Sequence, residues 1–147
     1  MKKKMIVFFA LYSVSIFQLG RIMQPCNFEF LEEVFPKQEL TEWDIFVQAL
    51  IEVESGGDIN AVGKTQDLGI LQITPIYVAE ANRLSNKGFT LKDRLSKEKS
   101  LEMFNIIQNH HNPSHDISKA IKLHNPGAGK WYADRIYKAM DQIRQAA

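Results

Sequence analysis

The strongest constraint on the fold is a succession of helix-period segments that begins at Thr41. Thr41 is suited to cap a helix, Asp44 suits its positive end, and apolar residues then recur at helical spacing as far as Val53. Gly56 and Gly57 follow, as expected where a helix ends. Start and stop signals predict four further helices, at residues 75–84, 96–112, 117–123 and 130–145, with a loop at 85–96. Strand signals are weak, so we expect a mainly α fold.

Length and composition are those of one ordinary globular domain. The chain has 147 residues, of which 45% are hydrophobic and 24% are charged, which suits a single core and argues against disorder. The formal net charge is +1 and no long basic stripe occurs, so no nucleic-acid partner is expected. Cys26 is the only cysteine, so packing rather than an internal disulfide must stabilise the fold.

The N-terminus is typical of an export signal. Three lysines at residues 2–4 precede an apolar run from Met5 to about Leu19. Because this run is shorter than the roughly 20 residues that span a membrane, a cleaved leader at residues 1–25 is favoured over a retained anchor, and lipidation of Cys26 stays open. Residues 26–40 then form a lead-in segment and residues 41–147 the folded domain. We expect an exported protein of the periplasm or cell envelope, either membrane-anchored or secreted.

Glu54 is the residue whose position most needs an explanation. It lies in the last turn of the first predicted helix, where the negative end of the helix dipole disfavours a carboxylate. The apolar face beside it disfavours the anion as well. Cleavage of a glycosidic bond requires a carboxylic acid that can protonate the leaving sugar oxygen. Glu54 is therefore a candidate general acid, and the alternative is a surface glutamate near a helix end.

Three motifs and a tyrosine accompany this glutamate in a fixed order. They are Glu54-Ser55, then Gly69-Ile70-Leu71-Gln72, then Leu123-His124-Asn125-Pro126-Gly127-Ala128-Gly129, and finally Tyr137. In this order the chain resembles the lytic transglycosylases of the soluble-lytic-transglycosylase (SLT) type, relatives of goose-type lysozyme. Their motifs read Glu-Ser, Gly-Leu-Met-Gln, Ala-Tyr-Asn-Ala-Gly-x-Gly and Tyr. The resemblance covers roughly residues 42–140 and implies a compact lysozyme-like helical domain with a substrate groove.

The resemblance also implies roles for the first two motifs. Glu54 acts as general acid and then as base, and Ser55 supports its orientation through a hydrogen bond. Gly69 lets the backbone approach the sugar, because it has no Cβ. Gln72 offers a donor and an acceptor to substrate groups, although a polar residue that caps a turn is the alternative.

The remaining positions include one departure from the family pattern. Asn125 is expected to hold the substrate or the Glu54 loop, with helix termination as the alternative, and Tyr137 to place its hydroxyl near Glu54. The family's tyrosine in Ala-Tyr-Asn is His124 here, and the following alanine is Pro126. His124 is expected to keep a hydrogen-bonding ring in the groove, although histidine is a residue type that can change its charge near neutral pH.

The implied reaction is cleavage of the β-1,4 bond between N-acetylmuramic acid and N-acetylglucosamine in peptidoglycan. A lytic transglycosylase needs only one acid, because the C6 hydroxyl of muramic acid attacks its own anomeric carbon and closes a 1,6-anhydro ring. A hydrolytic muramidase needs a second carboxylate, for which Asp58 and Asp67 are the candidates. We favour the first reaction over the second, and over a non-catalytic peptidoglycan-binding or assembly protein.

The implied partners are peptidoglycan glycan strands, with no cofactor. We expect a monomer, and an association with secretion or conjugation machinery fits an exported domain of this kind. The histidines at positions 110, 111 and 115 suggest a metal site as a rival hypothesis. Pro113 interrupts the helix that would align His111 with His115, so we expect no metal there.

Overall fold

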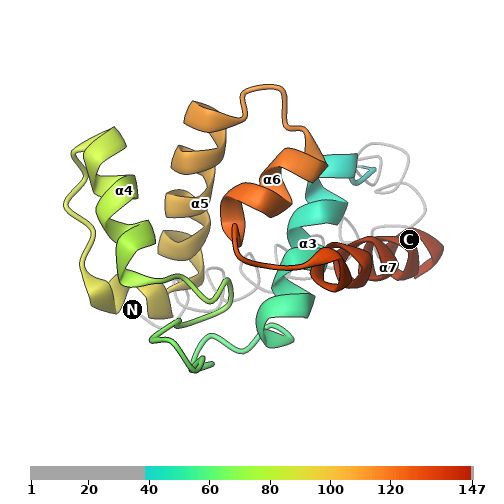
Figure 1. Cartoon of the computed structure of the whole chain (residues 1–147), viewed down its shortest axis with the longest axis horizontal. Coiled ribbons are helices and arrows are strands. Elements are labelled where there is room, and N and C mark those ends of the chain that lie inside the picture. Colours follow the sequence, from blue (N-terminus) through green and yellow to red (C-terminus); the bar gives the residue numbers. More distant parts are fainter. Residues whose placement is uncertain (1–38, 147) are drawn as a thin grey trace, which may run out of the picture. The chain divides into compact units, whose positions relative to one another are not determined.

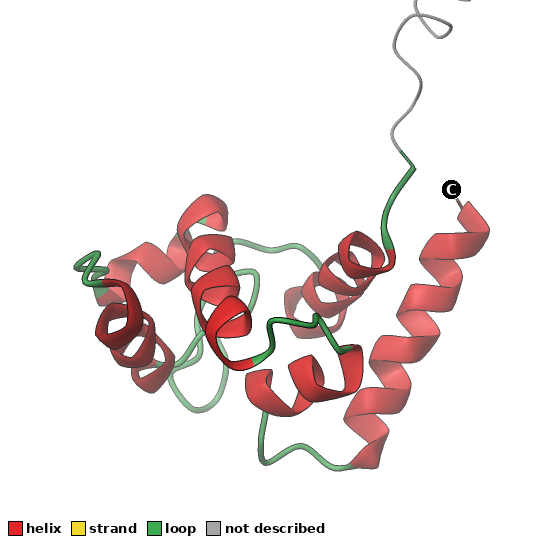
Figure 2. Cartoon of the chain, turned by 90° about the horizontal axis from the view of Figure 1, so that it is seen from above, coloured by secondary structure: helices red, strands yellow, loops and turns green. Residues whose placement is uncertain are grey.

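The computed structural model describes residues 39–146, and the chain from Leu40 onward forms one compact unit. Its helices are α3 (Glu42–Ser55), α4 (Pro75–Ser85), the 3₁₀ helix η1 (Leu91–Leu95), α5 (Lys97–His111), α6 (Ile117–His124) and α7 (Lys130–Ala146). No strand occurs in this part of the chain (Figure 2), so the mainly α prediction is confirmed. The predicted signal segment, Cys26 and nearly all of the lead-in segment lie outside the described residues.

Local capping signals explain where α3 begins and ends. Thr41 and Asp44 form a capping box, in which each side chain accepts a hydrogen bond from the other residue's backbone N–H. At the other end, Gly56 adopts a left-handed conformation (φ 62°) and its N–H donates to the carbonyl of Glu52. Glu54 consequently lies in the last turn, as predicted.

The core joins α3 and α7 on one side to α4 and α5 on the other. α3 packs mainly against α7, and α4 mainly against α5 (Figure 1). Fully buried side chains from these helices and the connecting loop include Phe46, Leu50, Ile70, Leu71, Ile73, Met103, Phe104, Ile136 and Met140. In residues 39–146 no helix combines the length and apolar character needed to cross a membrane.

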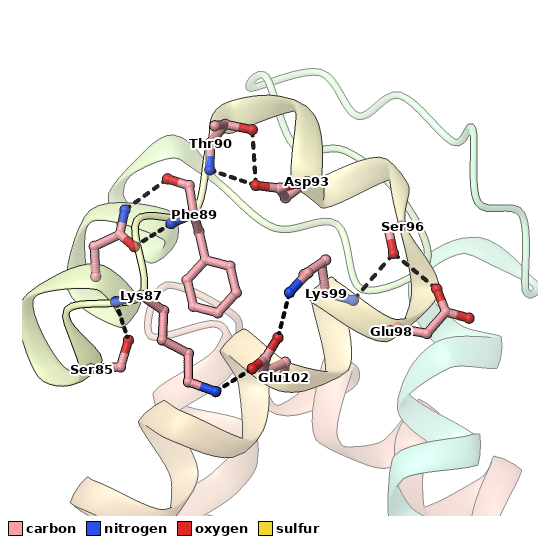
Figure 3. Close-up of polar contacts among 10 residues, drawn as sticks. Ser85, Lys87, Phe89, Thr90, Asp93, Ser96, Glu98, Lys99 and Glu102 are labelled. Atoms are coloured by element: carbon pink, nitrogen blue, oxygen red, sulfur yellow. Dashed lines mark hydrogen bonds and ion pairs between the residues drawn. The ribbon is translucent and has the colours of Figure 1, made fainter.

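The segment predicted as a loop at residues 85–96 contains a short helix. Thr90 and Asp93 form a capping box around the start of η1 (Figure 3). Arg94 within η1 is buried, and its guanidinium donates to the carbonyls of Leu91, Gln66 and Ile73. A buried cation needs such partners, so Arg94 ties the loop between α3 and α4 to the rest of the fold.

Candidate active site

A groove of about 490 Å³ opens beside the C-terminal end of α3. Its wall is formed by side chains from the end of α3, from the loop before α4, from α4, from α5 and from the end of α6. The lining residues are Glu54, Thr65, Asp67, Gln72, Thr74, Ile76, Tyr77, Glu80, Ile107, His111, Leu123, His124, Asn125 and Pro126. Five of the residues predicted from sequence therefore share one cavity, namely Glu54, Asp67, Gln72, His124 and Asn125.

Glu54 lies at the edge of this groove in a mostly buried position. Its side chain is 13% exposed, and its Oε1 accepts a hydrogen bond from the hydroxyl of Tyr132. Nε2 of His124 lies 3.4 Å from the same oxygen. Burial, followed by the nearby charge of Glu54, raises the pKa of Tyr132 above its usual range, so this hydroxyl remains a donor. The two neighbours come from α6 and α7, which are far from Glu54 in sequence.

The tyrosine beside Glu54 is Tyr132, so the prediction that Tyr137 fills this place is wrong. Tyr132 belongs to the buried face of α7 together with Ile136 and Met140. Tyr137 is five residues further along, which turns its side chain about 140° around the helix from Tyr132. It is 42% exposed and does not line the groove; it lines a neighbouring pocket whose wall also includes Tyr132. The spacing of four residues between Tyr132, Ile136 and Met140 is the sequence signal that identifies the inward tyrosine.

Ser55 supports Glu54 indirectly. Its hydroxyl donates to the carbonyl of Ile70 at 2.9 Å and accepts from the N–H of Gly57 at 3.1 Å. The first contact joins the end of α3 to the second motif, fifteen residues away. Ser55 thus fixes the helix end that carries Glu54 rather than the carboxyl group itself.

Gly69 makes room for a backbone carbonyl of the protein and not for the expected sugar. A Cβ built on Gly69 would lie 1.9 Å from the carbonyl oxygen of Arg94, and the residue has φ +76°. It does not line the groove. The glycine therefore permits the backbone of η1 to approach the loop, which corrects the prediction that it makes room for the substrate.

Gln72 lines the groove, but the nitrogen of its amide group is already engaged. Its Nε2 donates to the carbonyls of Gly69 at 2.9 Å and Ala61 at 3.2 Å. These bonds hold the loop between α3 and α4 in its turn, in agreement with the alternative considered from sequence. The donor that was expected for a substrate group is engaged within the protein.

Asn125 and His124 occupy the end of α6. The backbone N–H of Asn125 donates to Ile121 and ends the helix, while the exposed residue also lines the groove. The structure thus shows helix termination by Asn125, and its place in the groove keeps contact with the substrate as a prediction. His124 is the last residue of α6, and its side chain is only 4% exposed.

The two candidate second carboxylates differ in position. Asp58 is exposed, accepts from the N–H of Asn60 and does not line the groove. Asp67 does line it, and both of its carboxylate oxygens accept from the hydroxyl of Thr65, at 2.9 and 2.8 Å. Of the two, only Asp67 has access to the same cavity as Glu54.

A third carboxylate, Glu80, was not identified from sequence. It lines the groove from α4 and binds Arg83 through both oxygens, with His111 3.0 Å from Oε1. Arg83 first, and His111 after it, lower the pKa of Glu80 to about 2. The helical spacing of Glu80 and Arg83 is the local signal for their ion pair, but nothing local in the sequence indicates the approach of His111 from α5.

The histidines of the rival metal hypothesis point to separate partners. His111 contacts Glu80, whereas the ring of His115 stacks on Trp43 with centroids 4.3 Å apart. Within residues 39–146, no group of three or more histidine, cysteine, aspartate or glutamate side chains could hold a metal ion.

Comparison with known proteins identifies one family. A family model described as the transglycosylase SLT domain matches residues 36–135. Searches of curated proteins and of solved structures found no significant match.

Proposed function

Because the chain belongs to the transglycosylase SLT domain family, the lysozyme-like lytic transglycosylases, we propose that it cleaves the β-1,4 bond between N-acetylmuramic acid and N-acetylglucosamine and forms a 1,6-anhydro end. Family membership confirms the resemblance and the lysozyme-like helical fold predicted from sequence. It also supports a peptidoglycan substrate and lytic transglycosylase activity in general. The finer assignment of bond and product is the proposal.

The observation that carries this proposal is the environment of Glu54. A largely buried carboxyl group at the edge of a groove, held by a tyrosine hydroxyl, suits a general acid. In the reaction, the Glu54 carboxylic acid gives its proton to the bridging oxygen as the bond from that oxygen to muramic C1 breaks. The C6 hydroxyl oxygen then bonds to C1, and its proton returns to the Glu54 carboxylate.

The other carboxylates of the groove favour this internal attack over hydrolysis. Glu80 is bound by Arg83 and His111, which makes it a weak base or nucleophile. Asp67 is engaged by Thr65 on both oxygens. Asp67 nevertheless faces the same cavity as Glu54, and this is the observation that favours a hydrolytic muramidase as the second candidate.

We further propose that the protein acts outside the cytoplasm, as a monomer in the periplasm or cell envelope. The basic and apolar start of the chain supports export, and a peptidoglycan substrate requires it. Association with secretion or conjugation machinery is compatible with this location.

Digestion of purified peptidoglycan, followed by mass analysis of the soluble products, tests the proposal. Anhydromuropeptides are expected. Products with reducing ends would identify a lysozyme instead, and binding to the polymer without any product would identify a non-catalytic peptidoglycan-binding protein.

A further inference from the structure

His124 replaces a tyrosine of the family pattern, and packing fixes its ring beside Glu54. The ring meets Tyr77 of α4 edge-on, with centroids 5.7 Å apart and an angle of 68°. It meets Phe104 of α5 in the same manner, at 6.0 Å and 66°. Because rings from two helices hold the imidazole, its Nε2 is kept near Oε1 of Glu54 rather than being free to turn away.

The opposite nitrogen of this ring indicates where its proton lies. Nδ1 of His124 is buried, and no group in residues 39–146 forms a hydrogen bond with it. A buried N–H without an acceptor is rarer in proteins than a buried acceptor without a donor. The proton of the neutral ring therefore belongs on Nε2, which lies 3.4 Å from Oε1 of Glu54. The two groups are not yet aligned as a hydrogen bond in this structure, and catalytic hydrogen bonds are often long or poorly aligned before substrate binds.

The Tyr132 hydroxyl and Nε2 of His124 therefore both face the same oxygen of the carboxyl group. Tyr132 already donates to Oε1, and no bond to Oε2 occurs within the described part of the chain. We propose that His124 is a positioning residue that donates from Nε2–H to Oε1 of Glu54 and, with Tyr132, leaves Oε2 to carry the proton given to the substrate. This proposal rests on the function proposed above.

The proton balance of the reaction follows from this arrangement. The Oε2–H bond breaks as the glycosidic oxygen takes the proton and the C1–O electron pair. Oε2 later receives the proton of the attacking C6 hydroxyl. His124 and Tyr132 keep their protons throughout, and their N–H and O–H groups stabilise the negative charge that Glu54 carries between the two transfers.

Two substitutions separate hydrogen bonding from packing. His124→Phe preserves an aromatic ring against Tyr77 and Phe104 but has no donor, whereas His124→Gln loses the ring and keeps an N–H near the position of Nε2. We expect His124→Phe to lower kcat on soluble glycan strands by roughly 10- to 100-fold with little change in KM, and His124→Gln to recover most of that loss. If His124 has only a packing role, His124→Phe should keep a higher kcat than His124→Gln. That order of rates would overturn the proposal.

A second measurement is made on the wild-type protein and does not depend on activity. A two-bond nitrogen–proton correlation spectrum of the wild-type protein distinguishes the two neutral tautomers of histidine, and comparison with His124→Gln assigns the signal. A proton on Nε2 is expected, and a proton on Nδ1 would overturn the proposal. If the wild-type protein makes no product, the proposed function fails while this spectrum still decides the donor. If it cleaves and His124→Phe cleaves equally fast, the donor role fails alone.

Discussion

Glu54 and Glu102 are both glutamates with two polar partners, but they lie in very different regions. Glu102 on α5 is partly exposed, at 29% of its side-chain surface, and Lys87 and Lys99 both reach its carboxylate (Figure 3). The two lysine side chains are about half exposed, and their hydrogen bonds lower the pKa of Glu102. Glu54 instead is mostly buried, and its partners are a tyrosine hydroxyl and an imidazole.

The difference shows which polar contacts matter for chemistry. Exposed ion pairs are screened by water and salt, and removal of one partner leaves the other hydrated. In the buried cluster, the loss of one partner leaves a polar group without compensation and changes the surroundings of the carboxyl that we propose as the proton donor. Substitutions in the two regions should therefore have effects of very different size.

The largest contrast is expected between Glu54→Gln and Glu102→Gln. Glu54→Gln removes the transferable proton but keeps the shape of the side chain, so cleavage of peptidoglycan should fall at least about 10³-fold while the fold is retained. Glu102→Gln should cleave at the wild-type rate. Release of soluble fragments measures both rates. Near-normal turnover by Glu54→Gln would show that Glu54 is not the catalytic acid.

The next contrast is between the two tyrosines of α7. Tyr132→Phe removes a donor to Glu54 and should lower kcat by roughly 10- to 100-fold, whereas Tyr137→Phe should leave it unchanged. Circular dichroism of both variants serves as the folding control. Equal rates for the two variants would contradict the assignment of Tyr132 as the partner of Glu54.

The loop between α3 and α4 allows a similar comparison between two glycines. In Gly69→Ala the added methyl group would collide with the carbonyl of Arg94 at φ +76°, which should cost about 2–5 kcal/mol of unfolding free energy. Gly57→Ala has the strained φ of +84° but open space around it, so roughly 1 kcal/mol is expected. Urea denaturation measures both losses, and similar values would show that the approach of Arg94 does not constrain this loop.

The smallest effect is expected for Glu80. Its pKa in the folded protein is about 2, below the reference value of 4.5, because of Arg83 first and then His111. A lowered pKa stabilises the folded state above about pH 4.5, and this contribution disappears as the pH falls toward 2. The small difference in melting temperature between wild type and Glu80→Gln should therefore shrink over this range. A difference that stays constant would show that the Glu80 charge does not contribute.

Much of the fold could be predicted because its signals are local. The starts of α3, α4 and α6 follow from their N-cap residues. These are Thr41, Thr74 and Asp116, and each side chain accepts a hydrogen bond from a backbone N–H three residues later. The 3₁₀ helix at Leu91–Leu95 was missed. Thr90 and Asp93 carry the same capping-box signal as Thr41 and Asp44, but the helix that they start has only five residues.

The candidate site was predicted only in part because its contacts join distant segments. The motif order placed Glu54, Gln72, His124 and Asn125 together, and the structure finds these four around one groove with Asp67, the candidate second carboxylate. The tyrosine was misassigned because Tyr137 was chosen by its place in the motif order and not by the helical period that puts Tyr132 on one face with Ile136 and Met140. The role of Gly69 depends on a carbonyl 25 residues later in sequence, at Arg94, which no local pattern shows.

The central claim is that one acid, Glu54, cleaves the glycan without an activated water, and the source of the oxygen at the new end tests it most directly. Digestion in water enriched in heavy oxygen should give anhydro ends that contain none of the label, because the C6 hydroxyl supplies the oxygen. Reducing ends that carry one labelled oxygen would show that water attacks, and would contradict the account.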